Sequence, residues 1–385
     1  MKVVYVSTLI SQKKLDYILD NAKLKPLQSI QKFNRLICEG LTLNECKVDV
    51  ISSIPMSRKI MNKYFWFNKK EKEDGINYKY IPFINIKIIR QIMLAINLVF
   101  ILMKESFNKE KKVFVCDILN TTISSITQLY CKIFKKKCIT IVTDLPRDIN
   151  SSSISSKINQ FFQSKYDGYI FITEAMNNII NKKNKPYIVM ECIVDNNIEK
   201  ESQDIIKNDK KVLLYAGGLY EKYGIKNLID AVKQIENKKI ELHLYGSGDV
   251  EDYIKKMNSD RIKYFGVKPN KEIIIAEQQA TLLVNPRFTK DEYTKYSFPS
   301  KIMEYMISGT PTLTTKLSGI PQEYYKYLFT FNDESVLGMK TTIEEILSKD
   351  KKIIQQKGIN AQKYVLENKN KRIQGYSIKR FLEKI

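Results

Sequence analysis

Apolar and polar positions alternate in blocks along residues 211–348. Short apolar runs, which predict buried strands, occupy 211–218, 240–249, 262–266, 280–286 and 310–315. Apolar residues three and four positions apart predict amphipathic helices over 226–237, 250–258, 270–279, 299–308 and 334–348. Strands that alternate with helices at this spacing indicate right-handed βαβ units around a parallel sheet.

The first half of the chain has the same rhythm in a looser form. Strands are predicted at 2–8, 47–55, 76–83, 111–117, 138–144 and 168–173, and helices at 27–41, 85–107, 121–134 and 153–164, the first of them ending at Gly40. The fold class is therefore α/β, with two Rossmann-like domains. We expect an N-terminal domain, a polar linker, a C-terminal domain and a basic C-terminal helix that packs back on the N-terminal domain, over 1–195, 196–211, 212–360 and 361–385.

Length and composition agree with two domains in a reducing compartment. The 385 residues are 43% hydrophobic, which is too much chain for one ordinary core. The six cysteines include no C-x-x-C pair and several lie in apolar segments, so we expect buried free thiols. The chain starts directly with a strand pattern, and we expect no signal peptide.

The longest apolar run, 91–103, is shorter than the ~18 residues of a membrane span. It predicts a buried or half-buried helix. Because Lys87, Arg90 and Lys104 flank the run, contact with an anionic membrane surface is the alternative.

Charge is uneven along the chain, whose formal net charge is +22. Residues 1–195 hold 31 Lys and Arg against 17 Asp and Glu, whereas the remaining residues hold 33 against 25. A solvated lysine-rich surface explains part of the excess, and an anionic membrane, an anionic substrate or nucleic acid are the sharper explanations. No basic stripe interleaved with aromatic residues is present, which argues against nucleic acid.

Candidate chemistry lies at the strand ends, where open α/β sheets bind their ligands. In AGGLYEKYG, Gly217 and Gly218 let the backbone approach a ligand, and Lys222 is placed to meet a phosphate. A G-x-G-x-x-G fingerprint is not present there, and a plain strand–helix turn is the alternative. Gly246, in YGSGD, opens the next strand end, either beside a nucleoside or in a turn that needs positive φ.

The segment KYSFPSKIMEYM predicts an anion site at a helix start. Phe298 precedes a proline and avoids the α region, so we expect Pro299 to be the first helical residue. The N–H groups of Ser300 and Lys301 then lack intrahelical acceptors at the positive end of the helix dipole, where Lys301 adds a full charge. Glu304, one turn further, is placed to accept hydrogen bonds from a ribose diol. The alternative is an ordinary surface Lys/Glu pair.

These segments together resemble retaining family-4 glycosyltransferases of the GT-B fold. YSFPSKIMEYMISGTPTLTT resembles the helix that carries the second glutamate of the family's E-x7-E pair and the EAMA-GTPV sequence that follows it. LLYAGGLYEKYGIKNLIDAV resembles the family's glycine loop and lysine segment, and LHLYGSGD resembles its nucleoside-side strand. The match covers about residues 212–325, and the first half is matched by its βαβ rhythm and by QKFNRLICEGL.

The resemblance implies an acceptor-side N-terminal domain, a donor-binding C-terminal domain and a role for each matching residue. Glu304 would hold the nucleotide ribose. Lys222 and the N–H groups around Ser300 and Lys301 would hold the diphosphate. Four residues would lie along the donor sugar: Tyr296, Ser297, Phe298 and Pro299.

Three departures from the family pattern stand out. The first glutamate of the pair falls at Tyr296, so the carboxylate grip on the sugar hydroxyls is absent or replaced. The arginine that follows the first loop glycine is replaced by Gly218, and Arg287 is the candidate substitute. Many relatives place a histidine near the anomeric carbon, but the only histidine here, His243, alternates within an apolar strand and is expected to be a satisfied core residue.

The acceptor-side polar or base residue must therefore be something else. Asp144, in IVTDLPRD, ends a strand of the N-terminal domain and is our candidate, ahead of Asp117 in VCDILN. The alternative for Asp144 is a turn or cap aspartate before Pro146.

The reaction that the resemblance implies is transfer of a sugar from a nucleotide-diphosphate donor to a hydroxyl, with retention of configuration. Asp144, Lys222 and Glu304 would be the catalytic residues, and the helix start with its lysines would stabilise the departing diphosphate. No D-x-D or His/Cys cluster is present, so we expect no metal or other cofactor.

Charge asymmetry and helix 85–107 favour a glycan or lipid-linked glycan acceptor, as in capsule, O-antigen or exopolysaccharide assembly. We expect a cytoplasmic protein, peripheral on the inner face of the cytoplasmic membrane, with no nucleic-acid partner. The alternatives are an epimerase-like GT-B enzyme, which the near absence of histidine disfavours, a basic nucleic-acid-binding protein, and a catalytically inactive scaffold, which Tyr296 suggests.

Overall fold

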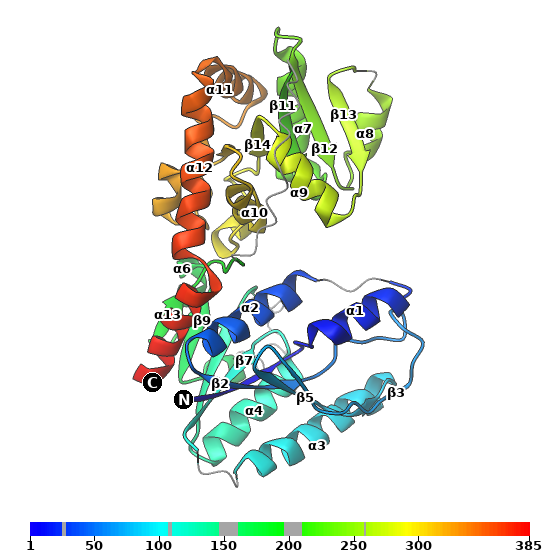
Figure 1. Ribbon diagram of the computed structural model, residues 1–385, viewed down its shortest axis with the longest axis vertical. Coiled ribbons are helices and arrows are strands. Elements are labelled where there is room, and N and C mark those ends of the chain that lie inside the picture. The colour runs from blue at the N-terminus through cyan, green and yellow to red at the C-terminus, as the bar shows by residue number, and fades with distance from the viewer. Residues whose placement is uncertain (25–27, 107–109, 146–160, 196–209, 258) are drawn as a thin grey trace. The chain divides into compact units, whose positions relative to one another are not determined.

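The computed structural model describes residues 1–24, 28–106, 110–145, 161–195, 210–257 and 259–385 (Figure 1). The chain forms two compact units, Met1–Ile193 with Asn370–Ile385, and Val194–Lys369. Each unit has a mainly parallel sheet with helices, so the prediction of two Rossmann-like domains is confirmed. Most of the expected linker 196–211 and of the expected helix 153–164 lies outside the described residues.

The first unit is built on a sheet whose described strands run in the order β10-β9-β8-β7-β1-β2-β5-β4. Neighbouring strands are parallel except β4 and β5, and β3 pairs with β6 in a separate antiparallel ribbon. Every residue of β1 is buried, because strands flank it on both edges and side chains cover both faces. The bounds are β1 Lys2–Ser7, β2 Lys47–Ser52, β3 Phe65–Trp66, β4 Glu71–Glu73, β5 Ile76–Tyr80, β6 Phe83–Ile84, β7 Lys112–Asp117, β8 Lys137–Val142, β9 Gly168–Phe171 and β10 Tyr187–Val189.

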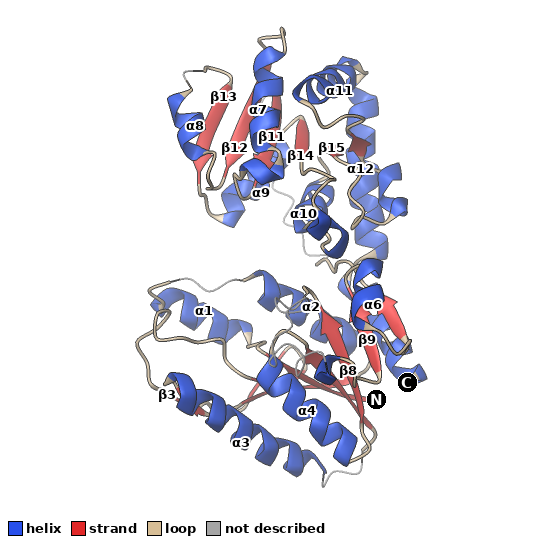
Figure 2. Ribbon diagram, turned by 180° about the vertical axis from the view of Figure 1, so that it is seen from behind, coloured by secondary structure: helices blue, strands red, loops and turns tan. Residues whose placement is uncertain are grey.

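Two pairs of helices pack against each other in this unit, α2 with α13 and α3 with α4 (Figures 1 and 2). The prediction that the first long helix ends at Gly40 is wrong, because α2 continues to Leu43. Gly40 instead lets α13 approach: a Cβ added there would lie 2.2 Å from the carbonyl oxygen of Lys371. The described helices are α1 Gln12–Asn21, α2 Ser29–Leu43, α3 Lys87–Ser106, α4 Thr121–Ile133, α6 Glu174–Ile180 and α13 Lys371–Lys384.

A buried ion-pair network joins β1, β2, β5 and β7. Asp49 Oδ2 is 2.9 Å from Lys2 Nζ and 2.8 Å from Lys79 Nζ. Glu105, near the end of α3, contacts Lys79 at 2.5 Å and Lys112 at 2.8 Å. These contacts join the last turn of α3 to β5 and β7.

The second unit contains a parallel sheet with the described strand order β13-β12-β11-β14-β15-β16. Its main core lies between the sheet, α7 and α11, and includes Leu213, Leu228, Leu242 and Ile343. The strands are β11 Lys211–Ala216, β12 Ile240–Tyr245, β13 Ile262–Gly266, β14 Leu282–Asn285, β15 Thr312–Thr314 and β16 Phe329–Thr330. The helices are η1 Glu221–Tyr223, α7 Ile225–Gln234, α8 Glu251–Lys256, α9 Asn270–Gln279, η2 Glu292–Tyr296, α10 Ser300–Ser308, η3 Gln322–Lys326, α11 Val336–Ser348 and α12 Lys351–Asn368.

The C-terminal segment consists of two helices that belong to different units. Helix α12 is part of the second unit, and the division falls between Lys369 and Asn370, nearer the C-terminus than the expected boundary at 361. Helix α13 is part of the first unit.

Burial agrees with the composition. All six cysteines are free and buried, as predicted. Helix α3 is half-buried: Leu94, Leu98 and Leu102 face the unit's core, and other apolar residues are exposed. Among the described helices, none combines the length and apolarity that crossing a membrane requires.

Candidate donor site

The start of α10 presents free backbone donors, as the sequence predicts. Helix α10 begins at Ser300, and Pro299 precedes it with an extended ψ of 107°, so the prediction that Pro299 is the first helical residue is wrong by one position. Pro299 still accepts a hydrogen bond from Ile302 N at 2.9 Å through its carbonyl oxygen. Within the part of the chain that the structure describes, no side chain caps the helix, so the N–H groups of Ser300 and Lys301 are left for a ligand or solvent.

Lys301 and Glu304 contact each other on the exposed side of α10. Lys301 Nζ lies 2.5 Å from Glu304 Oε2, and the two side chains are 24% and 45% exposed. The sequence assigns these residues to a diphosphate and a ribose, whereas the structure pairs them. A ligand that uses Glu304 must therefore compete with Lys301.

The residues just before α10 divide between core and surface. Phe298 is 7% exposed and its ring packs on Tyr324, with 5.5 Å between ring centroids. Its side chain is thus a core anchor rather than a lining of the predicted sugar site. Tyr296, which ends η2, and Ser297 are half-buried.

A buried hydrogen bond fixes α10 beside the glycine loop. Tyr305, fully buried, accepts a hydrogen bond from Ala216 N at 3.0 Å through its hydroxyl oxygen. Ala216 is the last residue of β11, and Gly217 and Gly218 follow it directly. The start of α10 and the glycine loop therefore lie at the same, carboxyl edge of the sheet.

Gly246 is explained by the packing of two loops. Its φ is +123°, and a Cβ added there would lie 1.8 Å from the carbonyl oxygen of Gly217. Hydrogen bonds from Gly217 N to Tyr245 O at 3.0 Å and from Leu219 N to Ser247 O at 2.9 Å join the same loops. This geometry supports the turn interpretation of YGSGD, and it also holds the glycine loop in place.

Two cations converge on one aromatic ring beside the glycine loop. Lys222 Nζ lies 5.3 Å from the centre of the Tyr223 ring, and the Arg287 guanidinium lies 4.5 Å from it. Arg287 follows β14, and its Nε is buried without a hydrogen-bond partner in the described structure. Lys222 is exposed. The structure thus brings Arg287, the predicted substitute for the missing arginine, to the same aromatic ring as Lys222.

The two aspartates of the first unit differ in environment. Asp144 is exposed, lies two residues beyond β8 and accepts a hydrogen bond from Leu145 N at 2.9 Å. Asp117, the last residue of β7, is 2% exposed, and burial raises its pKa to about 6 against hydrogen bonds from Leu119 N and Asn120 Nδ2. The first is a turn aspartate, and the second is a buried carboxyl with a near-neutral pKa.

His243 is satisfied, as predicted, but half-buried rather than in the core. Its Nε2 lies 3.1 Å from Glu241 Oε2, and burial lowers its pKa although Glu241 opposes this. Within the described ranges, no group of three or more His, Cys, Asp or Glu side chains is arranged to hold a metal ion.

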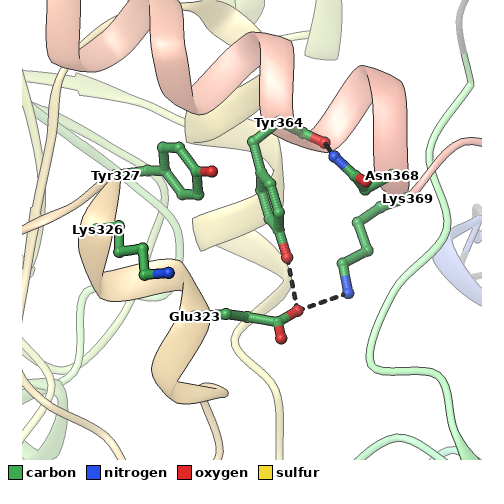
Figure 3. A pocket seen from close by; sticks show the side chains of 6 residues that line it. All are labelled: Glu323, Lys326, Tyr327, Tyr364, Asn368 and Lys369. Carbon is green, nitrogen blue, oxygen red and sulfur yellow. Dashed lines mark hydrogen bonds and ion pairs between the residues drawn. The ribbon is translucent and has the colours of Figure 1, made fainter.

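A surface pocket of the second unit lies elsewhere, and none of the predicted donor residues lines it. Glu323 accepts hydrogen bonds there from the Tyr364 hydroxyl at 2.6 Å and from Lys369 Nζ at 3.1 Å (Figure 3). Its lining residues are Glu323, Lys326, Tyr327, Tyr364, Asn368 and Lys369. We place the candidate site at the strand ends instead, because that edge combines backbone donors with the cations Lys222 and Arg287.

Two residues of this edge are missing from the sequence interpretation. Tyr305, on α10, and Glu277, on the neighbouring helix α9, are both almost fully buried. The helical spacing of Tyr305 indicates a core residue, but nothing in the sequence gives the partner of its hydroxyl. A glutamate on an amphipathic helix ordinarily predicts a solvated position.

Comparison with known proteins bears on the fold and the enzyme class of the chain. Residues 197–369 match the family model for glycosyl transferases group 1. The HepE protein of Anabaena, solved with UDP, superposes with a TM-score of 0.65 at 13% identity over 100% of both chains. Sucrose-phosphate synthase from Thermosynechococcus elongatus gives 0.68 at 14% identity over 100% of this chain and 99% of that one. The lipopolysaccharide outer core galactosyltransferase WaaB gives 0.62 at 14% identity, with the same coverage.

No curated protein sequence matches the chain. The structural likeness at these identities shows the fold, and the family model gives the enzyme class, so the prediction of a glycosyltransferase is confirmed. The chain has the GT-B fold, and its residues 197–369 match the family model for glycosyl transferases group 1.

Proposed function

We propose that this protein is a retaining glycosyltransferase of the family-4 type, which transfers a sugar from a nucleotide-diphosphate sugar to a hydroxyl of a lipid-linked glycan. The observation that carries the donor half is the convergence of Lys222 and Arg287 on the Tyr223 ring, at the sheet edge where α10 begins. HepE, which has the same fold, is solved in complex with UDP and with UDP-glucose, and this supports a nucleotide-sugar donor.

In this proposal the donor diphosphate lies between the glycine loop and α10. Lys222, Arg287 and the N–H groups of Ser300 and Lys301 carry the charge that develops on the leaving diphosphate. Glu304 turns from Lys301 to the ribose hydroxyls. Fixed charges and backbone dipoles need no rearrangement of water during bond breaking, which is why such an arrangement accelerates the reaction.

The chemistry at the sugar needs few protein groups. The departing phosphate assists the incoming hydroxyl on the same face of the sugar, which accounts for the proposed retention. Asp144 is the acceptor-side residue that the sequence favours, and Asp117 is its rival because its buried carboxyl can exist in both protonation states near neutral pH. The proposed reaction uses no metal or other cofactor.

A thermal-shift screen with UDP-, GDP-, ADP- and dTDP-sugars tests the donor half, because a ligand that binds only the folded state raises the unfolding temperature. We expect Lys222→Met and Arg287→Met each to weaken binding of the responding nucleotide sugar by about tenfold or more. Lys233→Met, at an exposed lysine of α7, is the matched control and should bind as the wild type does. If none of the four donors stabilises the protein, the proposal is wrong.

Asp117→Asn and Asp144→Asn separate the two acceptor-side candidates in a transfer assay. We expect the responsible residue to lower kcat while donor binding stays unchanged. A protein that binds donor but shows neither transfer nor hydrolysis would support the inactive-scaffold alternative.

The exposed face of α3 supports a lipid-linked acceptor. Ile88, Ile92, Ile96 and Phe100 recur at helical spacing on one face and are 72%, 54%, 52% and 60% exposed. The apolar residues Val99 and Met103 continue this face, while Leu94, Leu98 and Leu102 face the core. An amphipathic helix of this kind lies well in a membrane interface.

Aromatic and basic residues extend this surface. On β3 and just beyond it, Phe65 and Phe67 are 60% and 62% exposed, and β3 pairs with β6, on which α3 packs. Lys87 and Lys104 are exposed at the two ends of α3. Arg90, the third flanking cation, is not available, because its guanidinium donates to the carbonyls of Ile54 and Met56.

We therefore place the reaction at the inner face of the cytoplasmic membrane, in capsule, O-antigen or exopolysaccharide assembly. WaaB, a lipopolysaccharide outer core galactosyltransferase, supports this class of acceptor. Sedimentation with anionic and neutral liposomes tests the membrane half. We expect Phe100→Glu and Ile92→Glu to abolish binding to anionic vesicles, and Leu337→Glu, at a 65% exposed leucine of α11, to leave it intact. If all variants sediment with anionic liposomes as the wild type does, the proposed membrane contact of α3 is contradicted.

A further inference from the structure

Glu277 is a buried carboxyl that the proposed mechanism does not use. It lies on α9, is 2% exposed, and its Oε1 has no hydrogen-bond partner in the described structure. The backbone of α9 is fixed at this point, since Thr310, just beyond α10, donates from its hydroxyl to Glu277 O at 2.7 Å. An unpaired buried carboxylate is costly, so its retention calls for a physical reason.

The charged groups that act on Glu277 both come from α10. Lys301 attracts its carboxylate and Glu304 repels it. The other elements packed around it contribute an apolar cluster with Leu214 and Leu283, and Tyr305 lies close enough for Glu277 to raise the pKa of its phenol, after the larger effect of burial. Because α9 packs on α10, buried Glu277 lies within electrostatic range of the Lys301–Glu304 pair.

Protonation decides what Glu277 does to this pair. Burial raises the pKa of Glu277 to about 7, with Lys301 opposing and Glu304 reinforcing the change. Neutral Glu277 leaves one ammonium and one carboxylate on α10. Ionised Glu277 makes two carboxylates compete for Lys301, which draws the ammonium inward and makes the cluster net negative.

We propose that Glu277 is a positioning residue of the donor site, which in its neutral form leaves Lys301 to the donor diphosphate and in its ionised form withdraws it. The inference rests on the proposed function, because it assumes a diphosphate at the start of α10. Donor binding and protonation of Glu277 then favour each other, as linkage requires.

Isothermal titration calorimetry at about pH 6 and about pH 8.5 tests this coupling. The probe is a nucleotide sugar, UDP-glucose or the GDP-, ADP- or dTDP-sugar that responds in the thermal-shift screen. A nucleotide sugar is used because a free terminal phosphate itself titrates near pH 6. We expect wild-type Kd to weaken by about tenfold at the higher pH, which corresponds to a one-unit higher pKa of Glu277 in the complex. Donor KM should follow Kd, and Glu277→Gln should have the kcat of the wild type at each pH.

Glu277→Gln keeps the shape and the neutral charge, so we expect it to bind at both pH values as the wild type does at the lower one. Glu272→Gln, on the same helix at a 56% exposed side chain, should keep the wild-type profile. Calorimetry in buffers of different ionisation enthalpy gives a readout without any variant: binding near pH 7 should take up protons.

Parallel pH profiles in wild type and Glu277→Gln, or proton release on binding, overturn the inference while leaving the proposed function standing. Failure of all four nucleotide sugars to bind overturns both.

Discussion

Replacing Glu105 by glutamine perturbs the buried ion-pair network of the first unit's sheet. Its carboxylate contacts Lys79 at 2.5 Å, Lys112 at 2.8 Å and Lys2 at 3.3 Å, with a side chain that is 10% exposed. Asp49 is the other carboxylate of the network. The substitution leaves three ammonium groups with one carboxylate, so we expect a large loss of stability in the first unit.

Two lines of reasoning give similar magnitudes. Burial raises the pKa of Glu105, but the hydrogen bonds and charges of Lys112, Lys79 and Lys2 outweigh it and hold the pKa at about 2, against an ordinary 4.5. By linkage, this lowering corresponds to ~3 kcal/mol of stability. Removing one partner of a buried ion pair costs ~3–5 kcal/mol in other proteins. Because the folded pKa is depressed, this stability is present above pH 4.5 and is lost as the pH falls toward 2.

Urea unfolding followed by tryptophan fluorescence measures this loss selectively. Trp66 is the only tryptophan and lies in the first unit, 2% exposed. We expect Glu105→Gln to lower the free energy of unfolding by ~3 kcal/mol at neutral pH, and by progressively less below pH 4.5. Glu383→Gln is the control, since its pair with Arg380 is exposed and contributes at most ~1 kcal/mol. A loss below ~1 kcal/mol, or a loss equally large at about pH 3, would refute the reasoning.

Three further changes test other parts of the structure. Burial raises the pKa of Asp117 from an ordinary 3.8 to about 6, so its carboxyl destabilises the fold progressively as the pH rises from 3.8 to 6; Asp117→Asn should stabilise the first unit by ~3 kcal/mol at about pH 8 and little at about pH 4, in the same fluorescence assay. Tyr305→Phe leaves the buried N–H of Ala216 without its acceptor and should cost ~1–3 kcal/mol in thermal unfolding followed by circular dichroism; an unchanged midpoint would contradict the role of this bond. Gly246→Ala should destabilise more than Gly266→Ala, because the added Cβ meets its nearest atom at 1.8 Å in the first and 4.0 Å in the second, and because a φ of +123° lies further from the left-handed helical region than a φ of +68°; equal losses would contradict this close packing.

The sheets could be predicted from sequence because their strands are buried on both faces. Runs such as KVVYVS and KVLLYA have no polar alternation, and these two strands end one and two residues before the predicted ends. Helix α1 has only Leu15 and Ile18 as buried residues, which is too few to predict a helix. The two- and three-residue strands β3, β4 and β6 are too short to show a period.

Gly40 shows a different limit. A glycine near the end of an amphipathic pattern is typical of a helix C-terminus, but here it marks the contact of α2 with α13, more than 300 residues further along the chain. A glycine that terminates a helix and one that admits a neighbour have the same sequence signature. Only the tertiary partner distinguishes them.

In the candidate site, the sequence predicts the backbone groups better than the side-chain contacts. Residues whose role is backbone-based, Ser300 and Lys301, follow from the proline and the helix pattern. The burial of Phe298, the pairing of Lys301 with Glu304 and the isolation of Glu277 depend on α9, η3 and the glycine loop, which the local pattern does not place. Sequence reasoning therefore predicts where the site is better than which side chains are free within it.

The charge of the candidate donor site gives a reason for two of the three departures from the pattern of the family that the sequence resembles, those at Tyr296 and Gly218. Replacing the sugar-side glutamate by Tyr296 removes a negative charge, and having Gly218 where an arginine is expected removes a positive one, so the two changes balance. With Arg287 brought to Tyr223 and Glu277 neutral, the residues proposed to contact the donor comprise the cations Lys222, Arg287 and Lys301 and the carboxylate Glu304. The surplus of two positive charges equals the charge of a nucleotide-sugar diphosphate. Ionisation of Glu277 would remove one of them, which makes its proton a determinant of donor affinity in the proposed site.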